Sequence, residues 1–237
     1  MNQKPDSTIF SEAKHSATRE GHKRINTCIS FAPNSSAGVI PSKTESTKAQ
    51  QVPDMEKMAL GVQLILEAVG EDVNRPGLLD TPSRVARMYR ELLYGTGINP
   101  ASEVTCEFEE GSEDPVIVKG IPFATVCEHH MVPFVGKADV AYIPKDGRIT
   151  GLSKIARVVE LAARRLQVQE RMTAEIADAM VEALQPQGVL VILNAEHLCM
   201  SIRGIKKPGS MTTTMTTRGL LKEDRNARLE IMQLLER

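Results

Sequence analysis

The pattern of hydrophobic positions changes along the chain, and each change predicts a different kind of element. Apolar residues spaced three and four apart predict a helix that follows Asp54 and ends at Gly70. A second helix is predicted to start at Thr81-Pro82, with threonine as its N-cap and proline at its first position, and to stop at Gly95. The body of the chain therefore begins with two packing helices.

Strand patterns and further amphipathic helices follow. Alternating and β-branched segments predict strands at residues 104–108, 115–118, 121–126, 135–143, 189–194, 198–202 and 211–217. Helical periodicity predicts helices over residues 153–166, 170–184 and 222–235. This order of helices, strands, two helices and strands predicts an α+β fold with mostly antiparallel pairing, because a parallel sheet would need strands and helices to alternate.

Residues 1–50 show neither period. They contain 13 serines and threonines and three more basic than acidic side chains. So little apolar surface cannot offset the entropy lost on ordering. We therefore predict a flexible tail over residues 1–50, an N-terminal helical region over residues 51–100 and a main domain over residues 101–237.

Composition narrows the classes of function. The 237 residues are 41% hydrophobic and 25% charged, as in soluble globular proteins, and the formal net charge is −1. The chain thus lacks the broad basic field expected of a nucleic-acid-binding protein, and no apolar run approaches the roughly 20 residues that span a membrane. Four cysteines and no secretory apolar stretch favour a cytoplasmic, reducing compartment, where a cysteine beside histidines is a metal or catalytic candidate.

The histidines of residues 51–237 all lie beside cysteines, in Cys127-Glu128-His129-His130 and in His197-Leu198-Cys199. A Cys-x-x-His pair can close on one ion from a turn, and a thiolate from a distant segment would complete a set of three ligands. Zinc accepts mixed sulfur and nitrogen ligands, and three protein ligands with one open position mark catalytic zinc sites. The sequence therefore predicts a Zn²⁺ site, with Cys127, His130 and Cys199 as the candidate ligands.

His129 and His197 then remain for proton transfer. A histidine can give and take protons near neutral pH beside a zinc-activated water, and His197 would share a face with Cys199 if both lie on one strand. Alternatively, these histidines only orient a ligand. The cysteines could also be buried thiols without a metal, and a structural zinc site would need a fourth ligand, for which Cys106 remains.

Charge is unusually placed where a helix is predicted to begin near residue 151. Lys154 and Arg157 lie in the first turn, where the helix dipole disfavours cations, and Ser153 is the candidate N-cap. Backbone N–H groups, a hydroxyl and two cations favour an anion such as phosphate, and Arg203 adds positive charge further along the chain. A solvated basic face is the alternative. Glu170 begins the next helix, which is ordinary, but its carboxylate could also accept two donors from an amide-like ring edge.

Four motifs in this order, at residues 127–130, 151–154, 167–171 and 197–204, resemble GTP cyclohydrolase I. The likeness runs from about residue 55 to the C-terminus and does not cover the tail. It implies a tunnelling fold, in which an antiparallel sheet packs against two helices, and a homodecamer with active sites at subunit interfaces. It also implies zinc-dependent conversion of GTP and water to 7,8-dihydroneopterin triphosphate and formate, the first step of tetrahydrofolate and pterin synthesis.

The resemblance also implies a role for each candidate residue. The zinc ligands would be Cys127, His130 and Cys199, and the proton-transfer residues would be His129 and His197. Glu170, with Gln169, would hold the guanine edge. The triphosphate would be held by Ser153, Lys154, Arg157 and Arg203. Two alternatives stay open: another pterin or deazapurine enzyme of the tunnelling fold, and a zinc-stabilised binding or scaffold protein without turnover.

Overall fold

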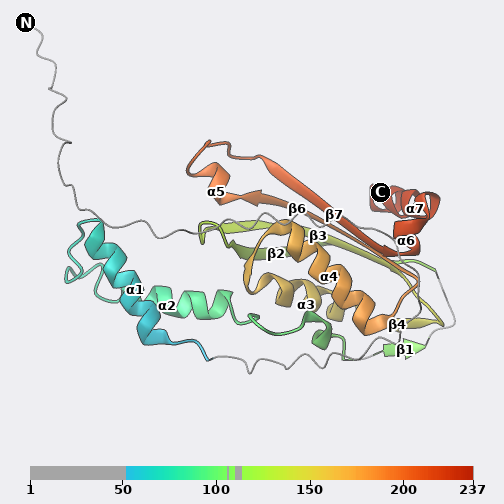
Figure 1. The fold of residues 1–237 in the computed structure, drawn as a ribbon, viewed down its shortest axis with the longest axis horizontal. Coiled ribbons are helices and arrows are strands. Elements are labelled where there is room, and N and C mark those ends of the chain that lie inside the picture. Colours follow the sequence, from blue (N-terminus) through green and yellow to red (C-terminus); the bar gives the residue numbers. More distant parts are fainter. Residues whose placement is uncertain (1–51, 106, 110–113, 237) are drawn as a thin grey trace, which may run out of the picture. The chain divides into compact units, whose positions relative to one another are not determined.

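The computed structural model describes residues 52–105, 107–109 and 114–236 (Figure 1). The predicted tail over residues 1–50 and the spare cysteine Cys106 lie outside them. The described residues form an α+β structure around a five-stranded sheet with the strand order β5-β2-β3-β6-β7. Its strands are β2 (Val116–Cys127), β3 (Pro133–Ile143), β5 (Leu166–Gln167), β6 (Gly188–His197) and β7 (Met211–Gly219).

Pairing within this sheet is antiparallel except for the short parallel contact of β2 with β5. A separate two-stranded sheet joins β1 (Glu107–Glu109) to β4 (Arg148–Thr150). The predicted α+β class with mostly antiparallel strands is therefore confirmed.

Two helices cover one face of the five-stranded sheet, α3 (Leu152–Ala163) and α4 (Gln169–Leu184) (Figure 1). Alternate strand residues such as Phe134, Ala138 and Val140 point into this layer and are fully buried. The buried stripe of α4 includes Met172, Ile176 and Met180, spaced three or four apart as the sequence pattern predicts. The layer places the first turn of α4 beside the end of β6.

The opposite face of the sheet carries a smaller core. Ala141 and Leu190, which alternate with the residues of the first layer, pack against Leu221 and Ile231. The last two belong to the short helix α6 (Leu220–Glu223) and to α7 (Arg225–Glu236). The C-terminal helices thus close part of the face that α3 and α4 leave open.

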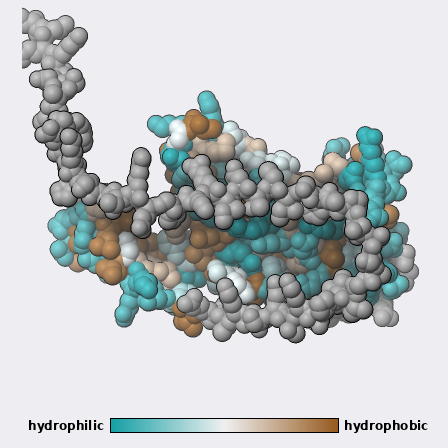
Figure 2. Space-filling model, viewed as in Figure 1, coloured by the Kyte–Doolittle hydropathy of each residue, from teal (hydrophilic) through white to brown (hydrophobic). Residues whose placement is uncertain are grey.

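The N-terminal helices α1 (Met55–Ala68) and α2 (Thr81–Leu92) pack on each other. Asp54 caps α1 by accepting a bond from the Lys57 backbone N–H at 2.9 Å. No residue of α1 is buried, and some of its apolar side chains are exposed to solvent, as the hydrophobic atoms on this part of the surface show (Figure 2). These exposed side chains are Leu60, Leu64 and Ile65, and Val69, which follows the end of the helix, is exposed as well.

Two predicted strands, at residues 115–118 and 121–126, are one strand, β2, interrupted by a bulge. Gly120 has a φ of +68°, which a glycine adopts without steric cost, and its N–H donates to Asp139 Oδ1 at 2.7 Å. The predicted C-terminal helix over residues 222–235 is likewise divided. It breaks at Asp224, whose carboxylate accepts from the Asn226 backbone N–H and so starts α7.

The prediction of a strand at residues 198–202 is wrong. Leu198–Ser201 forms the short helix α5, closed by a backbone bond from Ile202 N–H to Leu198 O at 3.0 Å. Apolar composition favoured a strand, but the Ser201 hydroxyl bonds to Glu196 and to the His197 carbonyl and holds the chain in a turn.

Two predicted N-caps are also wrong. The helix α3 begins at Leu152 after Gly151, with no side-chain cap from Ser153, and the N-cap of α2 is Asp80, one residue before the predicted Thr81. The side-chain signals place these two helix starts one or two residues too late, because a helix boundary depends on backbone angles that the side chains only bias.

Candidate metal and substrate site

The hairpin turn between β2 and β3 presents the Cys127-Glu128-His129-His130 segment. Cys127 closes the turn at both ends, because its N–H donates to Val132 O at 3.0 Å and its carbonyl accepts from Met131 N–H at 2.9 Å. Met131 adopts a left-handed φ of 54°, and its carbonyl accepts from the Tyr89 hydroxyl of α2 at 3.3 Å. The turn is thus fixed by its own backbone and by a contact from the N-terminal helices.

A second set of bonds fixes the turn from the side of α4. The Glu128 N–H donates to Gln167 O at 3.0 Å, and Arg171 Nη2 lies 2.5 Å from Glu128 Oε2. This guanidinium holds the pKa of the Glu128 carboxyl below its ordinary value. Sequence reasoning gave Glu128 and Arg171 no separate role. Their only signal was their place inside two of the family motifs.

Cys127, His197 and Cys199 come together in space. Their ligand atoms all lie within 4.8 Å of one another, although they come from the end of β2, the end of β6 and the helix α5. Cys127 is buried, and the other two are half-buried. His197 and Cys199 approach through a strand-to-helix turn and not, as predicted, along one strand face.

His130, the predicted imidazole ligand, is not in this group. Its Nε2 lies 3.0 Å from Arg203 Nη1. Because a guanidinium can only donate, His130 Nε2 accepts that bond. The structure therefore brings two predicted site residues, His130 and Arg203, into contact with each other. The neighbouring His129 turns toward the sulfur, with Nδ1 3.6 Å from Cys127 Sγ.

The electrostatics of the group favour a cation. Burial and the adjacent sulfur of Cys127 raise the pKa of the Cys199 thiol. Without a cation beside them, the two sulfurs therefore do not readily carry negative charge at the same time. A bound cation would reverse that effect, because a coordinated thiol loses its proton. Burial lowers the pKa of His197, which favours the neutral imidazole that metals bind. This Cys–His–Cys group could therefore hold a metal ion.

The group opens into a cavity of about 240 Å³ between α4, β6, β7 and the hairpin turn. Its lining residues are Cys127, His129, Val168, Gln169, Glu170, His197, Cys199, Met200 and Thr212. Six of the eleven predicted site residues thus line one cavity. Sequence reasoning missed Thr212, because the threonine-rich segment that contains it showed only the pattern of a strand.

The predicted anion-binding residues of α3 do not line this cavity. Ser153 and Arg157 are exposed, and Lys154 Nζ donates to Thr105 Oγ1 at 2.7 Å. Because α3 begins at Leu152, Lys154 lies in its first turn as predicted, but Arg157 lies in the second turn. Among the described residues, the basic helix start and the Cys–His–Cys group therefore do not share one cavity.

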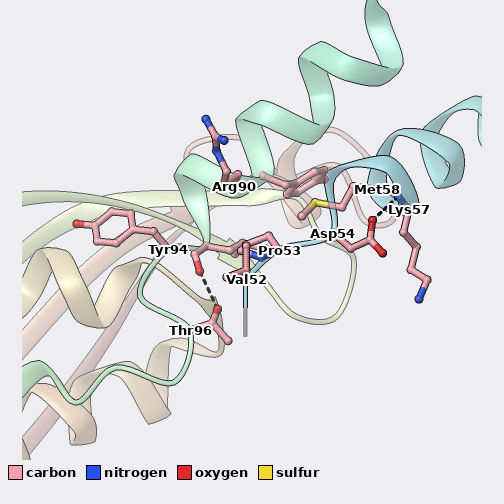
Figure 3. A pocket seen from close by; sticks show the side chains of 10 residues that line it. Val52, Pro53, Asp54, Lys57, Met58, Arg90, Tyr94 and Thr96 are labelled. Atoms are coloured by element: carbon pink, nitrogen blue, oxygen red, sulfur yellow. Dashed lines mark hydrogen bonds between the residues drawn. The ribbon is translucent and has the colours of Figure 1, made fainter. Parts of the chain in front are cut away.

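Another cavity, of about 460 Å³, lies between the start of α1 and the end of α2 (Figure 3). Val52, Pro53 and Met58 contribute apolar surface to it, while the charged ends of Lys57 and Arg90 point away. None of the predicted site residues lines this cavity. The 240 Å³ cavity, which contains the cysteines and histidines, is therefore the candidate site.

Taken together, the fold and the cavity define an α+β protein with a thiolate–imidazole site of the kind that binds a transition metal. The family model of GTP cyclohydrolase I matches residues 58–236. The chain therefore belongs to the GTP cyclohydrolase I family.

Relatives of known name agree with this assignment. The chain is 59% identical over 180 residues to a GTP cyclohydrolase 1 of Streptococcus pyogenes serotype M49 (strain NZ131), a match that covers 76% of this chain and 93% of that protein. It is 60% identical over 180 residues to another GTP cyclohydrolase 1 of Streptococcus pyogenes, with the same coverage.

A crystal structure of an archaeosine synthase QueF-Like protein in the apo form shows 18% identity and a TM-score of 0.39, covering 46% of this chain and 96% of that one. Within residues 52–236, no described helix is both long and apolar enough to cross a membrane.

Proposed function

We propose that this chain is a zinc-dependent GTP cyclohydrolase that converts GTP and water to 7,8-dihydroneopterin triphosphate and formate. The observation that carries the proposal is the meeting of Cys127, His197 and Cys199 in a cavity that also contains His129 and Glu170. Family membership supplies the substrate class. The donor types fit zinc, because thiolate and imidazole are its preferred ligands.

Cys127 and Cys199 supply the two thiolate ligands, and His130 supplies the imidazole by releasing its bond to Arg203. When bound, zinc would supply a Lewis acid that lowers the pKa of a water molecule towards about 7. A second assignment, with His197 as the imidazole ligand, is favoured by its place within 4.8 Å of both sulfurs. Whichever of His130 and His197 binds zinc, the other imidazole stays free to transfer protons.

The other predicted site residues bind and orient the substrate. Glu170 is exposed at the first turn of α4 and accepts from the N–H groups of the guanine edge. His129 and His197 carry protons to and from the purine during the opening of its five-membered ring. Arg203, which already lies beside His130, holds the triphosphate together with Ser153, Lys154 and Arg157.

The chain acts as a homo-oligomer, a homodecamer by analogy with its family. Two observations support an assembly: the apolar side chains of α1 are exposed, and the basic start of α3 does not line the cavity of its own chain. In an assembly, Ser153, Lys154 and Arg157 complete the site of a neighbouring copy. Light scattering coupled to size-exclusion chromatography tests this, and a monomer at assay concentration would contradict it.

Metal content and formate release, measured on one purified sample with GTP, test the function. We expect about one zinc per chain, and formate together with a pterin that fluoresces after oxidation. Cys199→Ala should lose zinc and activity. Cys106→Ala is the matched control and should keep both.

Each alternative has its own outcome in this experiment. If Cys106→Ala loses zinc as Cys199→Ala does, and the wild type shows no turnover, the result would support the scaffold protein. Full zinc occupancy without formate release from GTP would support a different pterin or deazapurine enzyme. Retention of all zinc by Cys199→Ala would overturn the ligand set.

A further inference from the structure

Gln169 is the first residue of α4 and lines the cavity, yet its side chain is only 1% exposed. A buried primary amide must satisfy two N–H donors and one oxygen acceptor within the protein. The bonds that this amide makes therefore decide which way it faces.

The nitrogen end of the amide faces acceptors from two strands. Gln169 Nε2 lies 3.1 Å from Leu193 O, 2.9 Å from Thr212 O and 3.2 Å from Thr214 Oγ1. The two backbone carbonyls can only accept. The opposite orientation of the amide would place its oxygen against both carbonyl oxygens, so the nitrogen must point toward β6 and β7.

The oxygen end of the amide therefore faces the imidazole. Gln169 Oε1 lies 2.8 Å from His197 Nε2, and an amide oxygen can only accept. His197 must consequently carry its proton on Nε2, which leaves the lone pair of the neutral ring on Nδ1. Because the amide cannot turn, the ring cannot exchange its two nitrogens without losing this bond.

A buried pair of hydroxyls supports the same arrangement. Thr173 Oγ1 donates to the Gln169 backbone carbonyl at 2.7 Å, so it must accept the bond from Thr214 Oγ1 at 2.6 Å. Thr214 thus uses its own proton on Thr173 and offers its oxygen to the amide of Gln169. Every donor in the network has an acceptor only when the amide faces His197 with its oxygen.

We propose that Gln169 is a positioning residue that fixes the orientation and the tautomer of His197, and that its side chain does not contact the purine. The catalytic consequence rests on the proposed function, in which His197 carries protons. Gln169 then acts through the imidazole, and the guanine edge is left to Glu170.

Steady-state kinetics of the zinc-loaded full chain distinguish a Gln169 that positions His197 from a Gln169 that binds the purine. Gln169→Met has no amide, and in the shorter Gln169→Asn the amide oxygen does not reach His197. In both variants we expect kcat to fall by about 10- to 100-fold while KM for GTP changes by less than about threefold. Thr173→Val is the matched control: it removes a buried bond of the same helix turn but leaves the amide orientation, so kcat should stay near the wild-type value. A rise in KM at unchanged kcat would place Gln169 on the purine and overturn the proposal.

Nitrogen-15 solid-state NMR of histidine-labelled protein gives a readout that does not depend on turnover. We expect the His197 signal, identified by its loss in His197→Asn, to report Nε2 protonation in the wild type and in Thr173→Val, and a mixture of tautomers in both Gln169 variants. An unchanged His197 signal in those variants would overturn the proposal. Absence of formate release from the wild type would instead overturn the proposed function, while the NMR comparison would still decide the role of Gln169.

Discussion

The imidazole of His197 lies flat on the ring of Phe134, with centroids 4.4 Å apart and planes inclined by 8°. Phe134 is fully buried at the start of β3, and the facing register of β3 and β6 pairs it directly with His197. The ring of His197 is therefore held in its plane by Phe134 and along its edge by Gln169. The sequence could not predict this contact, because no local pattern links a phenylalanine to a histidine 63 positions away.

Replacement of Phe134 by leucine should loosen His197. We expect Phe134→Leu to lower the free energy of unfolding by about 1–2 kcal/mol and to lower kcat as well, because the imidazole loses its stacking partner. Phe123→Leu is the control, since Phe123 packs edge-on against Phe134 at 6.1 Å in the same core. Chemical denaturation and initial rates measure both effects. Equal kcat in the two variants would show that stacking on Phe134 does not matter for turnover.

The imidazole ligand of zinc can be identified from two alanine variants. If His130 is the ligand, His130→Ala loses zinc and activity together, whereas His197→Ala keeps zinc and loses turnover. Removal of one of three protein ligands should weaken zinc binding at least about tenfold, by analogy with the loss seen when supporting partners of a metal ligand are removed. Zinc content after dialysis against a weak chelator measures this. The reverse pattern would assign the ligand role to His197.

Glu196 should control substrate affinity through the segment that carries Arg203. Its Oε1 accepts from Gly209 N–H at 2.8 Å and from Ser201 Oγ at 2.7 Å, bonds that hold the pKa of this carboxyl below its ordinary value. The carboxylate thus ties both ends of the segment between α5 and β7 to β6. Glu196→Gln should raise KM for GTP by about three- to tenfold with little change in kcat.

The control for that experiment is Glu230→Gln, which removes an exposed carboxylate on α7. Its KM should match the wild type. A fall in kcat at constant KM in Glu196→Gln would mean that Glu196 acts on the adjacent His197 and not on the segment that bears Arg203.

The Glu128–Arg171 pair predicts a pH dependence of stability. The bond from Arg171 lowers the pKa of Glu128 from its ordinary 4.5, so the folded state binds this proton less readily than the unfolded chain does. The stabilisation is therefore fully present above about pH 4.5 and disappears as the pH falls through the lowered pKa. Denaturation of the zinc-free protein at about pH 6 and about pH 3.5 should show that the stability deficit of Glu128→Gln relative to wild type is smaller at the lower pH. A difference that is the same at both pH values would contradict this.

Gly136 marks a close approach of β3 to β6. A Cβ atom at this position would lie 2.1 Å from Asn194 O and 2.7 Å from Ala195 Cα, so the two strands would have to separate. We expect Gly136→Ala to destabilise the chain by about 3 kcal/mol, measured by chemical denaturation. Gly61→Ala is the control, because a Cβ there meets no atom within 4 Å and alanine favours the helix α1. A fully stable Gly136→Ala would show that β6 can shift at no cost.

Much of the fold could be predicted from residue patterns. The stripes of α3 and α4, the strands β3 and β7 and the α+β class follow from periodicity, because burial on one face requires apolar residues at a fixed spacing. The errors lie where nonlocal or capping bonds override local preference. The helix α5 replaces a predicted strand because Ser201 bonds back to Glu196 and His197, and β2 continues through a bulge because Gly120 bonds to Asp139.

The sequence by itself determined which groups are available for chemistry: cysteines beside histidines in two segments, a basic helix start and a glutamate at the next one. Side-chain types and their spacing are local properties, and they suffice to indicate a metal and an anion. Only the tertiary structure decided which histidine lies with the two cysteines and that Gln169 faces inward, toward His197. Those relationships depend on the pairing of β3, β6 and β7 and on the packing of α4, which bring together residues far apart in the chain.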